Sequence, residues 1–141
     1  MRESAIPAVE AALLKQLTGH TDEALLAEGK PEPSPDEFVA LWEVDSENEY
    51  ASISGPFPRF HEMINLQVVI EVIRASAADF APPRERAQEI AAAVEDGLRL
   101  DLTLSRAWLF GSIAKRKQQY FRTDKQRGCR IFLTISGKAE T

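Results

Sequence analysis

The stretch HEMINLQVVIEVIRAS, residues 61–76, decides the fold that we expect for this chain. Alternation of apolar and other residues predicts a long β-strand whose side chains point to two faces in turn. One face is apolar throughout and is expected to lie against the core: Ile64, Leu66, Val68, Ile70 and Val72. The other face is mixed: Met63, Asn65, Gln67, Val69, Glu71 and Ile73. The mixed face leaves open whether solvent, a substrate or another protein chain lies against it.

Two segments carry apolar residues at the spacing of an amphipathic helix. The first spans about residues 4–18, with Ser4 as its expected N-cap. The second spans residues 81–100 and begins with two prolines in its first turn. Its apolar stripe consists of Ala87, Ile90, Ala91, Val94 and Leu98. Between the first helix and the strands, residues 20–36 are acidic and rich in proline, which predicts an extended surface connector.

The remaining segments predict strands and turns. FVALWEV (residues 38–44) predicts a strand, and the charged stretch DSENEY (residues 45–50) predicts a turn before a second, irregular strand. SRAWLFGSIAKR (residues 105–116) and CRIFLTIS (residues 129–136) predict an antiparallel hairpin with a long arm. This order predicts an α+β fold: a mainly antiparallel sheet, two principal helices packed on one face, and an extended hairpin arm.

Length and composition predict one globular domain over residues 1–141. Acidic residues outnumber basic ones by 22 to 17, so the average surface repels nucleic acid and anionic membranes. No secretory signal is recognisable and no apolar run is long enough to span a bilayer, so we expect a soluble protein made inside the cell. The single cysteine, Cys129, lies in an apolar alternation and is expected to be a buried free thiol.

Residues that could carry catalysis or bind a metal are sparse. His20 and His61 lie far apart and have no other ligand at a metal-binding spacing. The chain has no phosphate-binding loop, dinucleotide-binding glycine motif or hydrolase nucleophile motif. Carboxylates of the second helix are expected to form local ion pairs: Arg86 with Glu89 and Glu95 with Arg99. We therefore expect no catalytic residues, no cofactor and no metal site.

Charge is segregated along the chain. Residues 22–49 contain ten acidic residues and one basic residue, whereas residues 115–127 contain six basic residues and one acidic residue. We call the second set the basic arm: Lys115, Arg116, Lys117, Arg122, Lys125 and Arg127. The first set includes an acidic turn: Asp45, Glu47 and Glu49.

The basic arm has three possible roles. It could bind nucleic-acid phosphates, helped by stacking on Tyr120 and Phe121, or an acidic protein surface, or it could be a solvated hairpin tip. The net negative charge of the chain disfavours nucleic acid as the primary ligand. A fitting protein partner is a second copy, because contact between the acidic turn and the basic arm is head-to-tail and generates a ring when the rotation closes.

From AVEAALLKQL to CRIFLTI the chain resembles the tail terminator, or tail-completion, proteins of long-tailed bacteriophages, within the broader group of small head–tail joining proteins. The resemblance lies in the order INLQVVIEVI, AAAVEDGLRLDLTL, SRAWLFGSIAKR and DKQRGCRIFLTIS. It includes the pattern V-E-x-x-L-R-x-D-x-T-L at the end of the second helix. The proline-rich residues 21–36 depart from the shorter connector expected in this family.

The resemblance implies a structural virion protein, made in the host bacterial cytoplasm and located at the tail–neck junction. Its implied form is a hexameric ring that caps the tail tube and ends tube polymerisation. The implied partners are further copies, the tail tube protein and the head-side connector or stopper protein, with DNA only in transit through the bore and no membrane.

On this interpretation, the mixed face of residues 61–76 meets a neighbouring subunit or the channel, through Asn65, Gln67 and Glu71. Two alternatives remain open. One is a head–tail connector or stopper ring subunit, and the other, from a different class, is a small-ligand-binding or catalytic α+β domain.

Overall fold

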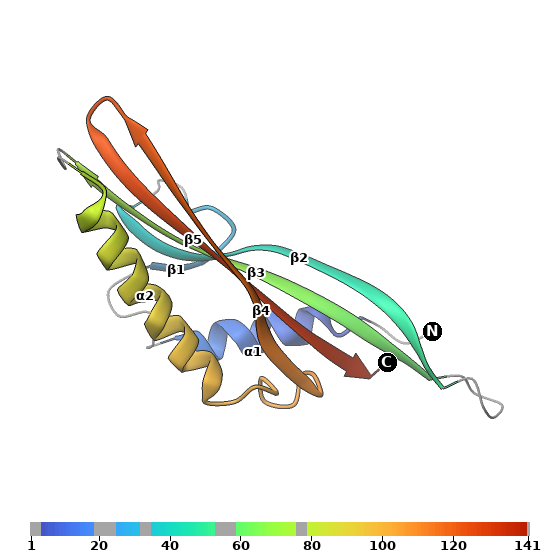
Figure 1. Ribbon diagram of the computed structural model, residues 1–141. Coiled ribbons are helices and arrows are strands. Elements are labelled where there is room, and N and C mark those ends of the chain that lie inside the picture. Colours follow the sequence, from blue (N-terminus) through green and yellow to red (C-terminus); the bar gives the residue numbers. More distant parts are fainter. Residues whose placement is uncertain (1–3, 19–24, 32–34, 53–58, 76–78, 141) are drawn as a thin grey trace.

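A computed structural model of the chain describes residues 4–18, 25–31, 35–52, 59–75 and 79–140 (Figure 1). Its elements in chain order are α1 (Ile6–Leu17), β1 (Leu25–Glu28), β2 (Glu37–Ser52), β3 (Arg59–Ala75), α2 (Ala81–Arg99), β4 (Phe110–Thr123) and β5 (Gln126–Glu140). The predicted α+β class is confirmed. Both helices lie on the same face of one sheet, and the β4–β5 hairpin extends beyond them as a long arm (Figure 1).

Within the described residues, the sheet has the order β1-β2-β3-β5-β4, and the β1–β2 pair alone is parallel. The long strand predicted at residues 61–76 is β3, which lies at the centre of the sheet. There Leu66 pairs with Val44 of β2 on one side and with Ile135 of β5 on the other. As the central strand, β3 has hydrogen-bonding partners along both edges. The strand β4 ends the sheet at one side.

Three predicted boundaries are wrong. DSENEY is part of β2, because Asp45 and Glu47 stay paired with Asn65 and Met63 of β3; the β2–β3 connection falls at residues 53–58, outside the described residues. The predicted connector contains β1, paired in parallel with the start of β2. The predicted strand at residues 105–116 begins only at Phe110.

The segment before β4 is held in a turn by Asp101. Its carboxylate accepts hydrogen bonds from the backbone N–H groups of Thr103 (2.9 Å) and Ser105 (2.8 Å) and from the Thr103 hydroxyl (2.6 Å). Leu104, Ser105 and Arg106 have positive φ angles of 48°, 57° and 66°. Left-handed backbone of this kind cannot continue a strand, which is why β4 starts later than predicted.

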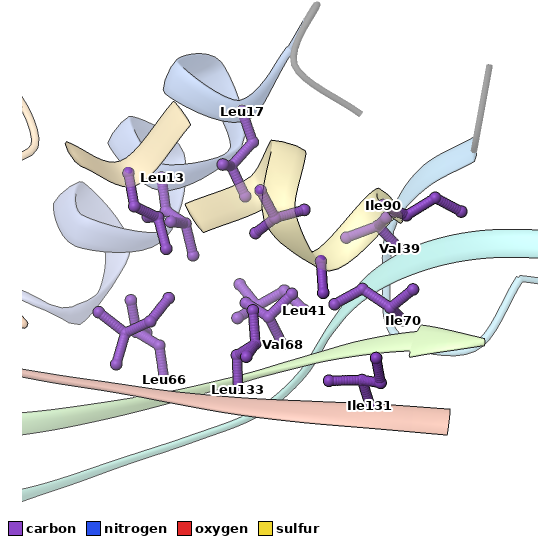
Figure 2. Close-up of a cluster of buried hydrophobic side chains, with 14 of the residues drawn as sticks. Leu13, Leu17, Val39, Leu41, Leu66, Val68, Ile70, Ile90, Ile131 and Leu133 are labelled. Carbon is purple, nitrogen blue, oxygen red and sulfur yellow. The ribbon is translucent and has the colours of Figure 1, made fainter. Parts of the chain in front are cut away.

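The core lies between the helices and one face of the sheet (Figure 2). The five residues predicted for the core face of β3 are all buried, as is the predicted apolar stripe of α2. They pack with buried residues of the other elements: Val9, Leu13, Leu17, Val39, Leu41, Ile131, Leu133 and Ile135. Cys129 is a buried free thiol, as predicted, and burial raises its pKa.

Two long-range polar contacts fix α1 on this core. Glu62 of β3, only 3% exposed, accepts hydrogen bonds from the Ser4 hydroxyl (2.6 Å) and the Ala5 backbone N–H (2.7 Å) at the start of α1. Burial alone would raise the pKa of Glu62, but these hydrogen bonds bring it below its ordinary value. The N-cap is Ala5 instead of the predicted Ser4, and the capping carboxylate comes from the sheet.

At the other end of α1, the Gln16 side chain closes the C-terminus of α2. Its Nε2 atom donates to the carbonyl oxygens of Gly97 (2.9 Å), Leu98 (3.2 Å) and Asp101 (3.0 Å). The last carbonyls of a helix have no partner within the helix, and this amide donates to two of them, those of Gly97 and Leu98. The two helices are thereby held in a fixed relation.

Candidate interaction surfaces

The basic arm forms the β4–β5 hairpin, in which Thr123 pairs with Gln126 across a tight turn. A bulge between Ile113 and Lys115 sets which side chains of β4 point toward the helices. After the bulge, Arg116 pairs with Leu133 and lies on the helix side, whereas Lys115 and Lys117 lie on the opposite face. The basic arm is therefore divided between the two faces of the sheet.

On the helix side, β4 is tied to α2 by polar contacts. The Arg116 guanidinium forms a hydrogen-bonded ion pair with Glu95. The predicted pair between Glu95 and Arg99 is therefore wrong, and Nη1 of Arg99 lies 3.5 Å from Oδ1 of Asp96. The predicted Arg86–Glu89 pair is confirmed at 2.9 Å. The side-chain amides of Gln88 and Gln118 add a further link between α2 and β4.

At the arm's distal end, aromatic rings hold two arginines. The guanidinium of Arg127, a predicted interface residue, lies 5.8 Å from the ring centroid of Phe80. The guanidinium of Arg130 lies 4.3 Å from the Phe121 ring, which itself covers Gly128 so closely that an added Cβ would be 2.1 Å from the ring. The remaining four charges, Lys115, Lys117, Arg122 and Lys125, are exposed and form the free part of the arm.

The predicted acidic turn is an acidic strand edge. Asp45 and Glu47 are exposed on the same face of β2, together with Glu43, which the sequence reasoning missed. Strict alternation counted from Phe38 would point Glu43 toward the core. A bulge between Leu41 and Glu43 shifts the alternation by one residue, so Glu43 points to the opposite face. The sequence signal that could have grouped Glu43 with Asp45 and Glu47 is the recurrence of acidic residues at every second position, as on one face of a strand. Of Glu49 only the backbone, paired with His61, is described.

The mixed face of β3 has two different halves. In the half near the acidic edge, Asn65 donates to Asp45 (2.8 Å) and accepts from the Ser136 hydroxyl (2.6 Å), and both Asn65 and Gln67 are half-buried. In the other half, Glu71 is only 4% exposed and accepts a hydrogen bond from Arg130. Within one subunit, Asn65 and Gln67 are therefore accessible and Glu71 is not.

An apolar surface lies beside the turn that precedes β4. Leu100, Leu102 and Leu109 are exposed there, next to a cavity of about 250 Å³. The cavity is lined by Leu98, Leu102, Leu104, Trp108, Ile113, Ile135, Arg99 and Arg116 among others. Its volume is below the range of about 300–1,000 Å³ typical of small-molecule sites.

No cluster of three or more potential metal ligands occurs within the described part of the chain. His61 is half-buried in β3, and His20 lies outside the described residues. None of the helices in the described ranges is both long and apolar enough to cross a membrane.

Comparison with solved structures identifies a protein chain of the same fold. No family model matches the chain, and no curated protein matches it in sequence. Among solved structures, a chain of one described as "Virion of native gene transfer agent (GTA) particle" superposes with a TM-score of 0.68 and 23% sequence identity, over 99% of this chain and 100% of that chain. The two chains share a fold. The likeness covers both helices, the sheet and the hairpin arm, so it is not restricted to a common submotif.

Proposed function

We propose that this chain is a structural, non-enzymatic subunit of a phage-like virion, acting as a tail terminator. In this role, it forms a hexameric ring that caps the tail tube, ends tube polymerisation and joins the tail to the head-side connector. The observation that carries the proposal is the full-length likeness to a chain of a gene transfer agent virion. The superposition covers both chains almost completely, so the likeness extends over the helices, the sheet and the hairpin arm.

The distribution of charge supports assembly into a ring. The exposed lysines of β4 lie at one edge of the sheet, and the exposed acids of β2 lie toward the other. Contact between two different surfaces of identical subunits is head-to-tail, and it closes into a ring when the rotation is a whole fraction of a turn. The accessible polar side chains of Asn65 and Gln67 suit a wet surface at a subunit contact or in the bore.

The net charge of −5 supports a bore through which DNA passes without being held. A protein that neutralises many phosphates binds DNA tightly, which would oppose its movement through a channel. DNA is thus a passenger, and the lasting partners are further copies, the tail tube protein and the head-side connector or stopper protein. The site of action is the tail–neck junction of the virion, after synthesis in the host bacterial cytoplasm.

A head–tail connector or stopper ring subunit is the second candidate, because the same virion likeness supports it equally. The two candidates differ in what they bind. A terminator binds the open end of a tail tube, whereas a connector or stopper binds the portal side of the neck.

The deciding experiment is negative-stain electron microscopy of the purified protein, alone and mixed with the tail tube protein of the same particle. We expect six-fold rings with a central hole, and tubes of limited length that end in a visible cap. The tube protein polymerised without this chain is the control and should give longer, uncapped tubes. Uncapped tubes in the presence of the protein would overturn the terminator assignment, and binding to portal-side rings would favour the connector.

A further inference from the structure

We infer that the subunits join by strand pairing, with the β4 edge of one copy bound antiparallel to the free segment of β2 in the next copy. The sheet then continues from subunit to subunit around the ring. This inference rests on the proposed ring and specifies the surface that builds it. The partner is a second copy, because the chain itself carries both complementary edges.

Both edges have backbone groups available for pairing. Within the described residues, β4 pairs with β5 alone, which leaves its outer edge open from Phe110 to Thr123. On the other side, β1 covers β2 only from Phe38 to Leu41. The β2 backbone beyond that point has β3 on one side and, in the described part of the chain, no strand on the other. Open edges of this length are templates for strand addition.

The strand directions are compatible with a ring. The pairs β2–β3, β3–β5 and β5–β4 are all antiparallel, so β4 runs opposite to β2. A rotation about an axis along the strands leaves every strand direction unchanged. It therefore brings β4 of one copy antiparallel to β2 of the next, and the alternation of directions continues through the interface without interruption.

The charges of the two edges are on the same face and in register. Glu43 pairs with Gln67, Gln67 with Thr134, and Thr134 with Lys115, so Glu43 and Lys115 end one row across the sheet. When the row continues into the next copy, Lys115 becomes the cross-strand neighbour of Glu43. Strand tilt in a closed ring can shift this pairing by two residues. Because side chains alternate between the faces with a period of two, Lys115 and Lys117 then still lie on the same face as Glu43 and Asp45.

Charge also decides against the two symmetric alternatives. Pairing β4 with β4 would place the lysines of two copies together, and pairing β2 with β2 would do the same with the acids. Like charges directly opposite each other on paired strands are destabilising, whereas opposite charges stabilise the pair. The only pairing of these edges that brings opposite charges together is β4 with β2, which is head-to-tail.

The test uses two charge-swapped variants. Variant A carries Lys115→Glu and Lys117→Glu, and variant B carries Glu43→Lys and Asp45→Lys. Each variant alone places like charges across every interface, so we expect loss of rings by sedimentation and electron microscopy. In an equimolar mixture, A and B can alternate, and every interface is again complementary; we expect rings to return. Unchanged thermal unfolding of each isolated variant is the folding control.

A second measurement fixes the register. Across one sheet, residues 43 and 115 are separated by three strand spacings, roughly 14 Å, which is too far for a disulfide within one subunit. The variant Glu43→Cys/Lys115→Cys should therefore give, on mild oxidation, a ladder of covalent oligomers that ends at the closed ring. Each single-cysteine variant should give dimers at most, because the native Cys129 is buried.

The outcomes separate this inference from the proposed function. Rings of A or B alone, no recovery in the mixture, or no ladder from the double-cysteine chain would overturn the strand pairing, even if the unmodified protein caps tubes. A ladder and recovery in the mixture, without capped tubes, would support the pairing and overturn the terminator role. Failure of the unmodified protein both to form rings and to cap tubes would overturn both.

Discussion

Arg116 of β4 forms an ion pair with Glu95 of α2, so this charge of the basic arm already has a partner within its own subunit. Its neighbours Lys115 and Lys117 point to the opposite face and remain exposed. The arm therefore contains charges of two kinds: Arg116 and Arg127 have partners within the subunit, and the exposed lysines are available for contacts with another molecule.

The substitution Arg116→Glu should lower the stability of the subunit, because it places two carboxylates next to each other. The Arg116 side chain is 54% exposed, so the loss should be modest, about 1 kcal/mol. Thermal or urea unfolding measures it. The matched control is Lys115→Glu, which should leave unfolding unchanged. The double variant Arg116→Glu/Glu95→Arg should recover part of the loss, and an equal effect of both single changes would contradict the division of the arm.

Glu62 should stabilise the fold in a pH-dependent way. Its pKa in the folded chain lies below the ordinary value of 4.5, so its contribution is present above pH 4.5 and is lost as the pH falls through the folded pKa. We expect Glu62→Gln to cost about 1–2 kcal/mol at pH 7, as for the loss of a helix cap, and progressively less in acid. Urea unfolding between about pH 3 and pH 7 tests this.

The control for Glu62 is Glu85→Gln, which changes an exposed carboxylate of α2. Its effect on the free energy of unfolding should be small at every pH. A Glu62→Gln penalty that stays constant down to the lowest pH would contradict the role of the ionised carboxylate at the start of α1.

Gly128 should not accept a side chain while Phe121 is present. A Cβ atom at position 128 would lie 2.1 Å from Cζ of Phe121, so the ring must move and lose its stacking with Arg130. We expect Gly128→Ala to destabilise the chain by about 1–3 kcal/mol. In a Phe121→Ala background the same change should cost much less, which a double-mutant cycle of unfolding free energies measures. Equal costs in the two backgrounds would exclude the close approach as the cause.

Much of the fold was predictable because the residues that face the core are apolar and recur at a regular spacing in the sequence. The core face of β3 alternates strictly, and the stripe of α2 recurs at helical spacing, so both elements and the α+β class followed from the sequence. The acidic residues 45–50 were misassigned to a turn because Asp, Ser and Asn favour turns locally. They form a strand because residues 60–65 of the neighbouring strand β3 pair with them.

The candidate surfaces were predictable only in outline. Segregated charge identified a basic segment and an acidic segment, but the faces of their side chains depend on two bulges, after Leu41 and after Ile113. The second bulge turns Arg116 toward Glu95 and Lys115 away from it. A bulge arises from the pairing of two strands and has no fixed signature in either one, so Glu43 was missed and Arg116 was counted as free.

Ring assembly should weaken as salt is raised, because the proposed contacts between Lys115 or Lys117 and the acids of β2 are exposed. The screening length falls from about 30 Å at 0.01 M salt to about 3 Å at 1 M. Analytical ultracentrifugation across this range of sodium chloride measures the fraction of rings, with the oxidised Glu43→Cys/Lys115→Cys ring as a salt-resistant control. A ring fraction independent of salt would assign the contact energy to apolar surfaces instead, and would make Leu100, Leu102 and Leu109 the next residues to substitute.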